Sequence, residues 1–186
     1  MKTQMDLSKL LELGKIQNEL EFERALIADR KLRVLLKEDP KYKATRKKLR
    51  NLIEDYEKRN WSAESNISHK KVQGNDAAEL IAEKERQFIQ NRKLIIRKKL
   101  KHLNLSQQDL GAILGHKSKS YMSELINGLS PFSIKDLIVI NRLLKINLTD
   151  LIPTFLAESD LVKIRTSIQK LDNPKLKLSK DDISMI

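Results

Sequence analysis

Residues 105–128 read LSQQDLGAILGHKSKSYMSELING, and this stretch decides the fold of the chain around it. Asp109 follows Ser106 at the spacing of a capping box, which predicts that a helix begins just after this serine. Gly115 tolerates the positive φ found at helix ends, so we expect the helix to end there. The apolar positions between these two signals lie at helical spacing and are Leu110, Ile113 and Leu114.

A second short helix is predicted directly after this glycine. Ser118 is its N-cap candidate, and Asn127-Gly128 closes it. The residues expected to face inward are Met122, Leu125 and Ile126. Two capped helices joined at a glycine turn predict a helix-turn-helix, in which the second helix can enter the major groove of DNA.

The composition indicates an all-α protein. Of the 186 residues, 33% are charged and only 4% are aromatic, with five glycines and four prolines. Sheets draw on aromatic residues and on turn formers, and both are scarce here. The formal net charge of +12 favours a polyanionic partner such as double-stranded DNA.

The same composition argues against several classes of protein. The chain has no cysteine, and His69, His102 and His116 never pair at metal-ligand spacing. Since a catalytic Ser/His/Asp set and a glycine-rich phosphate loop are also missing, we expect no enzyme, no metal and no cofactor. No apolar run approaches the roughly 20 residues that cross a membrane, and the first residues lack a signal-peptide core. We therefore expect a cytoplasmic, nucleoid-associated protein with no membrane partner.

A separate helical unit is expected over residues 1–61. The leucines before Gly14 predict a short helix, and Asn18 with Glu21 predicts the N-terminus of a longer one. This longer helix ends near Pro40, and a second long helix then runs back beside it. A hairpin of two helices is thin, so we expect it to need another surface to complete its core.

Polar residues 62–75 are interpreted as a linker. Asp76 with Glu79 then predicts a capping box for a long helix that ends at His102. Its basic end, residues 97–101, suits either the helix dipole or a DNA phosphate, and the sequence leaves both open. The buried face of this helix is expected at Leu80, Ile81, Phe88, Leu94, Ile95 and Leu100.

Two more helices complete an expected DNA-binding domain of residues 76–156. Ser133 with Asp136 caps an apolar helix over residues 134–145, and Thr149 caps a short last one. The core of the apolar helix is expected at Leu137, Ile138, Ile140, Leu143, Leu144 and Ile146.

The C-terminal tail, residues 157–186, predicts one further helix and a short strand at residues 175–178. Its apolar surface is expected to dock on its own domain or on a second copy, and in the second case the tail would mediate dimerisation.

The segments LSQQDLGAILG, SYMSELING and FSIKDLIVINRLLKINLTDLIP together resemble the five-helix domain of Xre/Cro-type transcription regulators, over residues 87–153. Upstream, GKIQNELEFERALIADRKLRVLLKEDP and LRNLIEDYEKRNW are similar to the N-terminal part of HigA-type antitoxins. That similarity is carried by Ile16, Glu19, Glu21-Phe22-Glu23, Ala25-Leu26, Ile53-Glu54 and Tyr56-Glu57.

These resemblances imply an antitoxin that binds a small basic ribonuclease toxin of the RelE type and represses its own operon as a homodimer. The residues assigned to the toxin are Glu19, Phe22, Glu23 and Leu26. The chain departs from the family in two places. Its turn at residues 115–120 is longer than usual, and its N-terminal region is slightly basic where antitoxins are commonly acidic.

If this fold is right, three residues are expected to contact the DNA backbone. Gln107 lies at a helix N-terminus, where its amide and the helix dipole both favour a phosphate. Lys117 and Lys119, in and after the turn, are expected to neutralise phosphates rather than read bases.

Four further residues of the second helix are assigned to the DNA. Ser120 and Ser123 can bond base edges or phosphates, and Tyr121 can contact a thymine methyl or a phosphate. Glu124 either accepts from a cytosine amine or is solvated beside a lysine, and the sequence leaves both open. A dimer on an inverted repeat would place the half-sites about 34–36 Å apart.

Two other functions stay open at this point. One is a free-standing Xre-family regulator without a toxin. The other is a helical adaptor that no longer binds DNA, which Glu124 and the altered turn favour.

Overall fold

The computed structural model describes residues 5–60, 69–156, 158–171, 173, 175 and 176. The chain divides into two compact units, Met1–Ile152 and Pro153–Ile186. The helices of the first unit are α1 (Leu7–Leu13), α2 (Glu19–Leu35), α3 (Tyr42–Asn60), α4 (His69–His102), α5 (Gln107–Leu114), α6 (Lys119–Asn127), α7 (Ile134–Leu144) and α8 (Leu148–Leu151). The second unit contains α9 (Glu158–Leu171). The described residues form helices and no strand, which confirms the all-α prediction.

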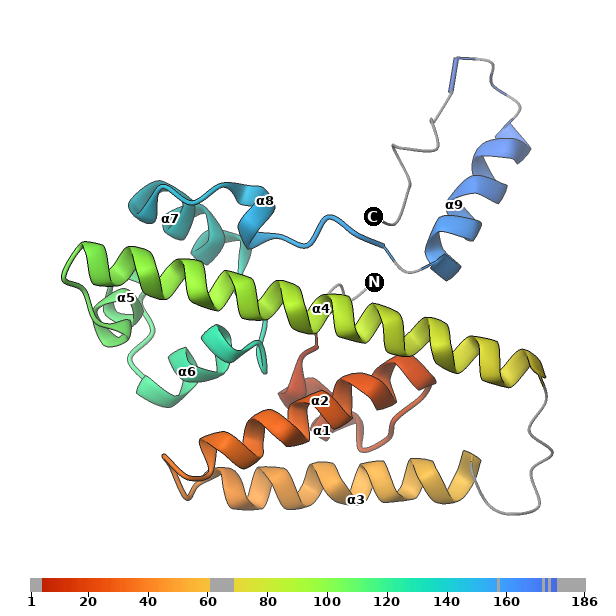
Figure 1. The fold of residues 1–186 in the computed structure, drawn as a ribbon, viewed down its shortest axis with the longest axis horizontal. Coiled ribbons are helices and arrows are strands. Elements are labelled where there is room, and N and C mark those ends of the chain that lie inside the picture. Colours follow the sequence, from red (N-terminus) through yellow and green to blue (C-terminus); the bar gives the residue numbers. More distant parts are fainter. Residues whose placement is uncertain (1–4, 61–68, 157, 172, 174, 177–186) are drawn as a thin grey trace. The chain divides into compact units, whose positions relative to one another are not determined.

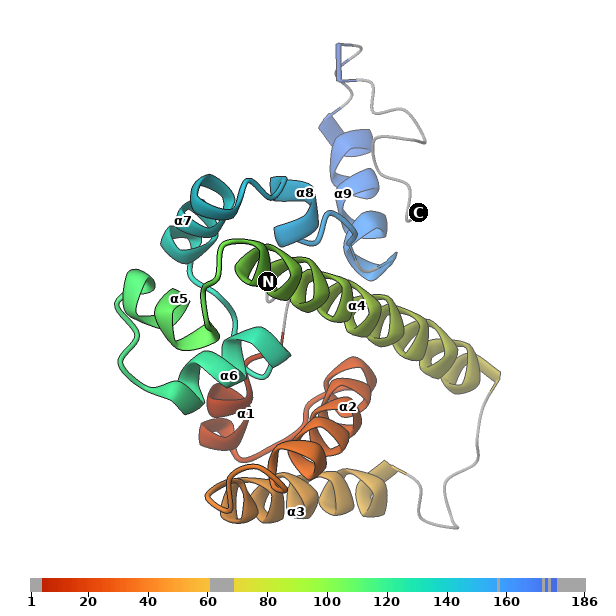
Figure 2. The same ribbon diagram turned by 60° about the vertical axis from the view of Figure 1, so that its left-hand side comes forward.

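The N-terminal helices begin and end where their local signals predict. Asn18 accepts a hydrogen bond from the Glu21 amide at the start of α2, and Gly14 ends α1 with φ of 63°. The hairpin of α2 and α3 is closed by the stacked rings of Phe22 and Tyr56, whose centroids lie 4.9 Å apart. The extra surface that this hairpin needs is α4, which lies along α2 on the side opposite α3 (Figures 1 and 2).

The start of α4 corrects the prediction. The helix begins at His69, so residues 69–75 are helical where a linker was expected. Asp76 and Glu79 therefore lie inside the helix and are not its cap. The rest of the expected linker, residues 62–68, lies outside the described residues.

The buried face of α4 also differs from the prediction. Leu80 and Leu94 are 51% and 55% exposed, because the buried stripe follows another register of the helix. This stripe consists of Ala78, Ile81, Ala82, Glu85, Ile89, Arg92, Ile96 and Leu100. Two of its members are charged and paired: Glu85 with Arg24 of α2, and Arg92 with the Leu151 carbonyl at 3.2 Å. Large apolar residues alone do not mark this stripe in the sequence, because small and charged residues form half of it.

The C-terminal half of α4 carries α5 to α8. Their core cluster contains Ile96 and Leu100 from α4, together with Leu110, Leu114, Met122, Leu125, Ile126, Phe132, Ile140, Leu144, Ile146 and Leu151. Arg92 is 2% exposed, and its guanidinium lies 5.2 Å from the Phe132 ring centroid. The expected core positions Ile113, Ile138 and Leu143 are exposed instead. The last short helix is flanked by Asn147 as its N-cap, with Thr149 inside it.

In the second unit, α9 confirms the helix predicted for the tail. Lys175 and Leu176 are not in a strand, and residues 177–178 of the predicted strand lie outside the described residues.

A backbone hydrogen bond and shared packing join the N-terminal helices to the helices after α4. The Leu7 amide donates to the Leu129 carbonyl at 2.9 Å, and Leu129 is buried in the N-terminal cluster. Gly128 has φ of 70° and lies so close to Ile89 of α4 that an added Cβ would come within 2.7 Å of the isoleucine Cγ2. This glycine therefore fixes how α6 approaches α4.

We predict that Gly128→Ala destabilises the protein more than Gly14→Ala. Both glycines are left-handed, which costs an alanine about 1–2 kcal/mol, but only Gly128 has a neighbour within 4 Å of the new Cβ. Displacing Ile89 adds about 1–3 kcal/mol. Denaturant unfolding of both variants measures the difference, and equal losses of stability would contradict the close approach.

Candidate nucleic-acid interface

α5 and α6 form a helix-turn-helix whose ends are fixed locally. Ser106 and Asp109 make the predicted reciprocal capping box, with side-chain to backbone distances of 3.1 and 2.7 Å. Gly115 ends α5 with φ of 85°, and Ser118 accepts a hydrogen bond from the Tyr121 amide at the start of α6. The inward residues Met122, Leu125 and Ile126 are at most 1% exposed, as predicted. α6 is therefore held firmly on the body of the first unit.

The turn between these helices is residues 115–118, because α6 already begins at Lys119, so it is shorter than the expected 115–120. It is tied to α7 by a contact that the sequence did not predict. His116 Nε2 lies 3.2 Å from a carboxylate oxygen of Asp136, which is buried. The Tyr121 ring packs edge-on against the His116 ring, with centroids 5.2 Å apart. The spacing of Ser133 and Asp136 predicts only the capping role of Asp136, so its contact with His116 was not predicted. The turn is thus fixed by packing against α6 and α7.

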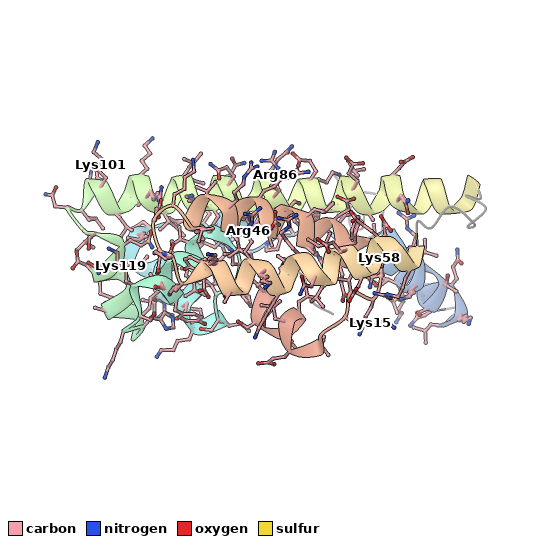
Figure 3. All side chains as sticks on the ribbon, turned by 90° about the horizontal axis from the view of Figure 1, so that it is seen from below. Lys15, Arg46, Lys58, Arg86, Lys101 and Lys119 are labelled. Atoms are coloured by element: carbon pink, nitrogen blue, oxygen red, sulfur yellow. The ribbon has the colours of Figure 1, made fainter. Side chains whose placement is uncertain are left out.

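The residues assigned to the DNA backbone are available for contact. Lys117 and Lys119 are exposed, Tyr121 is 40% exposed and Gln107 is half-buried at the start of α5. Further basic side chains come from α4: Figure 3 shows Arg86 and Lys101 projecting from the same side of that helix. Exposed cations beside a helix N-terminus are what a phosphate backbone requires.

Two residues of α6 are engaged by the turn between α2 and α3, residues 39–42, which we call the hairpin tip. Ser120 Oγ donates to Asp39 Oδ2 at 3.2 Å, and the Tyr42 hydroxyl donates to the Ser120 carbonyl at 3.3 Å. Burial raises the pKa of the half-buried Glu124, while Lys41 and the Tyr42 hydroxyl act to lower it. Glu124 therefore has a lysine nearby, as in the solvated alternative, but it is half-buried rather than exposed. Its contact with a base stays a prediction.

The hairpin tip could not be predicted from the local sequence, because Asp39 and Ser120 are 81 positions apart. Burial and the nearby Glu124 and Asp39 carboxylates raise the pKa of Tyr42 to about 12, so this phenol keeps its proton and can donate. In the described arrangement, the tip covers part of the face that was assigned to bases.

Ser123 lies on a different side of α6 from the tip contacts. Its carbonyl and hydroxyl accept from the Asn127 amide at 2.8 and 3.3 Å. The Asn127 side-chain oxygen in turn accepts from Lys93 Nζ of α4 at 2.7 Å. This chain of hydrogen bonds holds Ser123 of α6 and Lys93 of α4 on either side of Asn127.

The four residues assigned to a toxin do not form an exposed patch. Phe22 is 6% exposed and stacks inside the hairpin, and Leu26 packs against the same core cluster. Glu19 accepts from the Tyr56 hydroxyl at 3.0 Å, and Glu23 is half-buried with a pKa raised mainly by burial. Phe22 and Leu26 thus belong to the packing of the hairpin, and a role in toxin binding stays a prediction.

Other kinds of site were searched for in the described part of the chain. Three or more His, Cys, Asp or Glu side chains do not gather there in a way that could hold a metal ion. None of the helices described has the length and apolar character needed to span a membrane.

Comparison with known families matches residues 96–151 to the helix-turn-helix family HTH_3. This match runs from the C-terminal part of α4 through α8, which confirms the Xre/Cro-type domain predicted from the sequence. Neither a curated protein nor a solved structure matches the chain. The similarity of the N-terminal region to HigA-type antitoxins stays a prediction.

The half-buried Glu124 predicts a dependence of stability on pH. Its pKa is raised in the folded protein, so the folded state binds more protons than the unfolded state in mildly acidic solution. The contribution of this group therefore becomes more favourable as pH falls through the folded pKa. We expect Glu124→Gln to be more stable than the wild type at pH 7 and to lose this advantage towards pH 4. Thermal unfolding at both pH values measures it, and an advantage that grows on acidification would contradict this assignment.

Proposed function

We propose that this chain is a sequence-specific DNA-binding transcription regulator that reads duplex DNA with α6. The observation that carries the proposal is the capped α5–turn–α6 arrangement, in which the inner side chains are buried while Lys117 and Lys119 are exposed. This is the geometry in which a recognition helix enters the major groove and the preceding helix contacts the backbone. The match of residues 96–151 to the helix-turn-helix family supports it.

Binding in this mode requires the hairpin tip to leave α6, since a base pair and Asp39 cannot both occupy the space beside Ser120. The two hydrogen bonds of the tip to Ser120 are 3.2 and 3.3 Å long. A neutral hydrogen bond such as that of Tyr42 contributes about 0.5–1.5 kcal/mol, and one to a carboxylate such as Asp39 about 1.5–3 kcal/mol, so these two contacts alone are weak enough to be exchanged for DNA contacts. We infer that the N-terminal helices regulate access to α6.

A single α6 reads only a few base pairs, so we propose that a homodimer binds an inverted repeat with half-sites about 34–36 Å apart. A chromosomal operator of this kind would place the protein at the nucleoid. The repressor role follows if the operator overlaps the promoter of its own gene.

An antitoxin is the second candidate function. The resemblance of the N-terminal region favours it, and so does the position of that region, because a protein that grips α2 or α3 would act directly on the hairpin tip. Co-expression with the product of the adjacent gene tests it. Recovery of a small basic ribonuclease in a stable complex supports an antitoxin, and a chain that regulates its operon with no such partner contradicts it.

The DNA-binding proposal predicts different effects for two substitutions in α6. Lys119→Ala should weaken binding to the operator and to random DNA alike and reduce the salt dependence by about one phosphate contact. Ser123→Ala should lose affinity mainly for the operator, by about 1–3 kcal/mol if it contacts a base. Titrations of fluorescent duplexes from upstream of the gene, at several salt concentrations, measure both effects. Lys48→Ala, which removes an exposed lysine of α3, is the matched control.

Identical behaviour of Lys119→Ala and Ser123→Ala on both kinds of DNA would refute the assigned roles. A wild-type chain that binds none of these duplexes, even with the hairpin tip loosened, would favour the adaptor.

Loosening the hairpin tip should increase DNA affinity. Tyr42→Phe removes the donor to the Ser120 carbonyl without changing charge, and Asp39→Ala removes the acceptor of Ser120 Oγ. Each lost contact shifts the population toward the open form, so we expect a gain of about two- to tenfold in operator affinity. Asp55→Ala on α3 removes an exposed acidic residue and controls for the charge change of Asp39→Ala. Unchanged or reduced affinity of Tyr42→Phe would contradict regulation by the tip.

A further inference from the structure

A cleft of about 590 Å³ lies between α2 and the helix-turn-helix. Its walls are formed by α2, by the middle of α4, by the start of α5 and by the side of α6 that carries Ser123 and Asn127. A volume of this size is typical of sites for small molecules. It is too small to admit a DNA duplex while α2 forms one wall.

The lining of the cleft is strongly basic. One acidic side chain, Glu38, faces six basic ones, which are Arg30, Lys31, Arg86, Lys93, Arg97 and Lys119. Two of the six have partners: Arg86 pairs with Glu83 at 2.6 Å, and Lys93 donates to Asn127. The excess of positive charge remains, so the cleft attracts anions.

Among these six cations, Lys31 has the most strongly lowered pKa. Burial, together with the nearby positive charges of Arg92, Lys93 and Arg86, lowers the pKa of Lys31 to about 8. Glu85 acts in the opposite sense, but its carboxylate is already held by Arg24. Among the described residues, Lys31 has no hydrogen-bond or ion-pair partner. An ammonium group in this position is costly unless an anion joins it.

The rest of the cleft is apolar on the α2 side and polar at the start of α5. Its apolar lining residues are Ile27, Val34 and Leu35 of α2, with Ile89 of α4 beside them. Gln107 and Gln108 bring the first turn of α5 to the cleft, where the helix dipole adds to the positive potential. An occupant that fits therefore has an anionic part and an apolar part.

We propose that this cleft binds a small molecule with several phosphate groups and a planar ring, the chemistry of a nucleoside polyphosphate. The phosphates lie among Lys31, Lys93 and Lys119, and the ring lies against the apolar side chains of α2. Bound in this way, the molecule bridges α2 to α4 and α6. It therefore stabilises the arrangement in which the hairpin tip covers α6.

The regulatory consequence rests on the proposed function, whereas the binding itself does not. Lys119, Ser123 and Gln107 line the cleft and are also assigned to DNA. A molecule in the cleft thus competes with DNA for these residues and lowers the affinity for the operator.

Calorimetric titration of the full chain with ATP, in the absence of DNA, tests the binding. We expect saturable binding of one ATP per chain, weaker binding of tripolyphosphate because it lacks the ring, and at least a tenfold loss of ATP affinity in Lys31→Met. A tenfold loss corresponds to about 1.4 kcal/mol. Lys48→Met, with the same charge change on the exposed face of α3, should bind ATP within about twofold of the wild type.

The outcomes separate a built site from general attraction to a basic protein. Equal losses in Lys31→Met and Lys48→Met, or ATP binding that never saturates, would overturn the proposal. Tripolyphosphate binding as tightly as ATP would overturn the part that concerns the ring.

The stability of Lys31→Met shows whether any loss of binding comes from misfolding. The pKa of Lys31 is lower in the folded than in the unfolded protein, so the unfolded state binds more protons between about pH 8 and 10.5. The penalty from this charge is complete below pH 8 and disappears as pH rises through that window. Lys31→Met should therefore unfold at a higher temperature than the wild type at pH 7, with the difference shrinking towards pH 10. A variant less stable than the wild type at pH 7 would contradict the uncompensated charge.

A competition experiment then keeps this proposal distinct from the DNA-binding proposal. ATP should weaken operator binding by the wild type and have little effect on operator binding by Lys31→Met. ATP binding without any DNA binding would refute the proposed function alone, and DNA binding without ATP binding would refute the cleft alone.

Discussion

The buried stripe of α4 is the constraint on which the rest of the first unit depends. At its N-terminal end this stripe packs on α2, and at its C-terminal end it supports α5 to α8. Between the two, Ile89 touches Gly128, and Arg92 ties the helix to the end of α8 through the Leu151 carbonyl. Because one helix carries both sets of neighbours, the hairpin of α2 and α3 is brought directly against α6.

That placement gives α6 two different surroundings within the same unit. On one side, the hairpin tip contacts Ser120 and Glu124, and on another, Ser123 and Lys119 line a basic cleft. Both surfaces involve residues that a DNA-reading helix would use. The N-terminal helices are therefore suited to control the access of DNA to α6. The signal would be a protein that binds these helices or a small anion that bridges them to α4. Either signal would act by shifting the balance between a covered and an open α6.

The sequence predicts those parts of the structure that are fixed by near neighbours. The capping box of Ser106 and Asp109, the left-handed Gly115 and the buried Met122 follow from spacing alone, so the ends of α5 and the inward face of α6 were predicted. Contacts between distant segments were not predicted. Nothing near Arg92 in the sequence indicates that it is buried, since its partner at Leu151 is 59 positions away. The burial of Phe22 was not predicted for the same reason, because a surface stripe and a core stripe have the same spacing.

The central claim is that the hairpin tip and duplex DNA exclude each other at α6. The chain has no native cysteine, so cysteines placed at Asp39 and Ser120 can be joined specifically through a short cleavable cross-link. Operator binding by this double variant, measured before and after cleavage, tests the claim most directly. The account predicts that the cross-linked protein does not bind and that cleavage restores binding. Equal binding in the two states would contradict it.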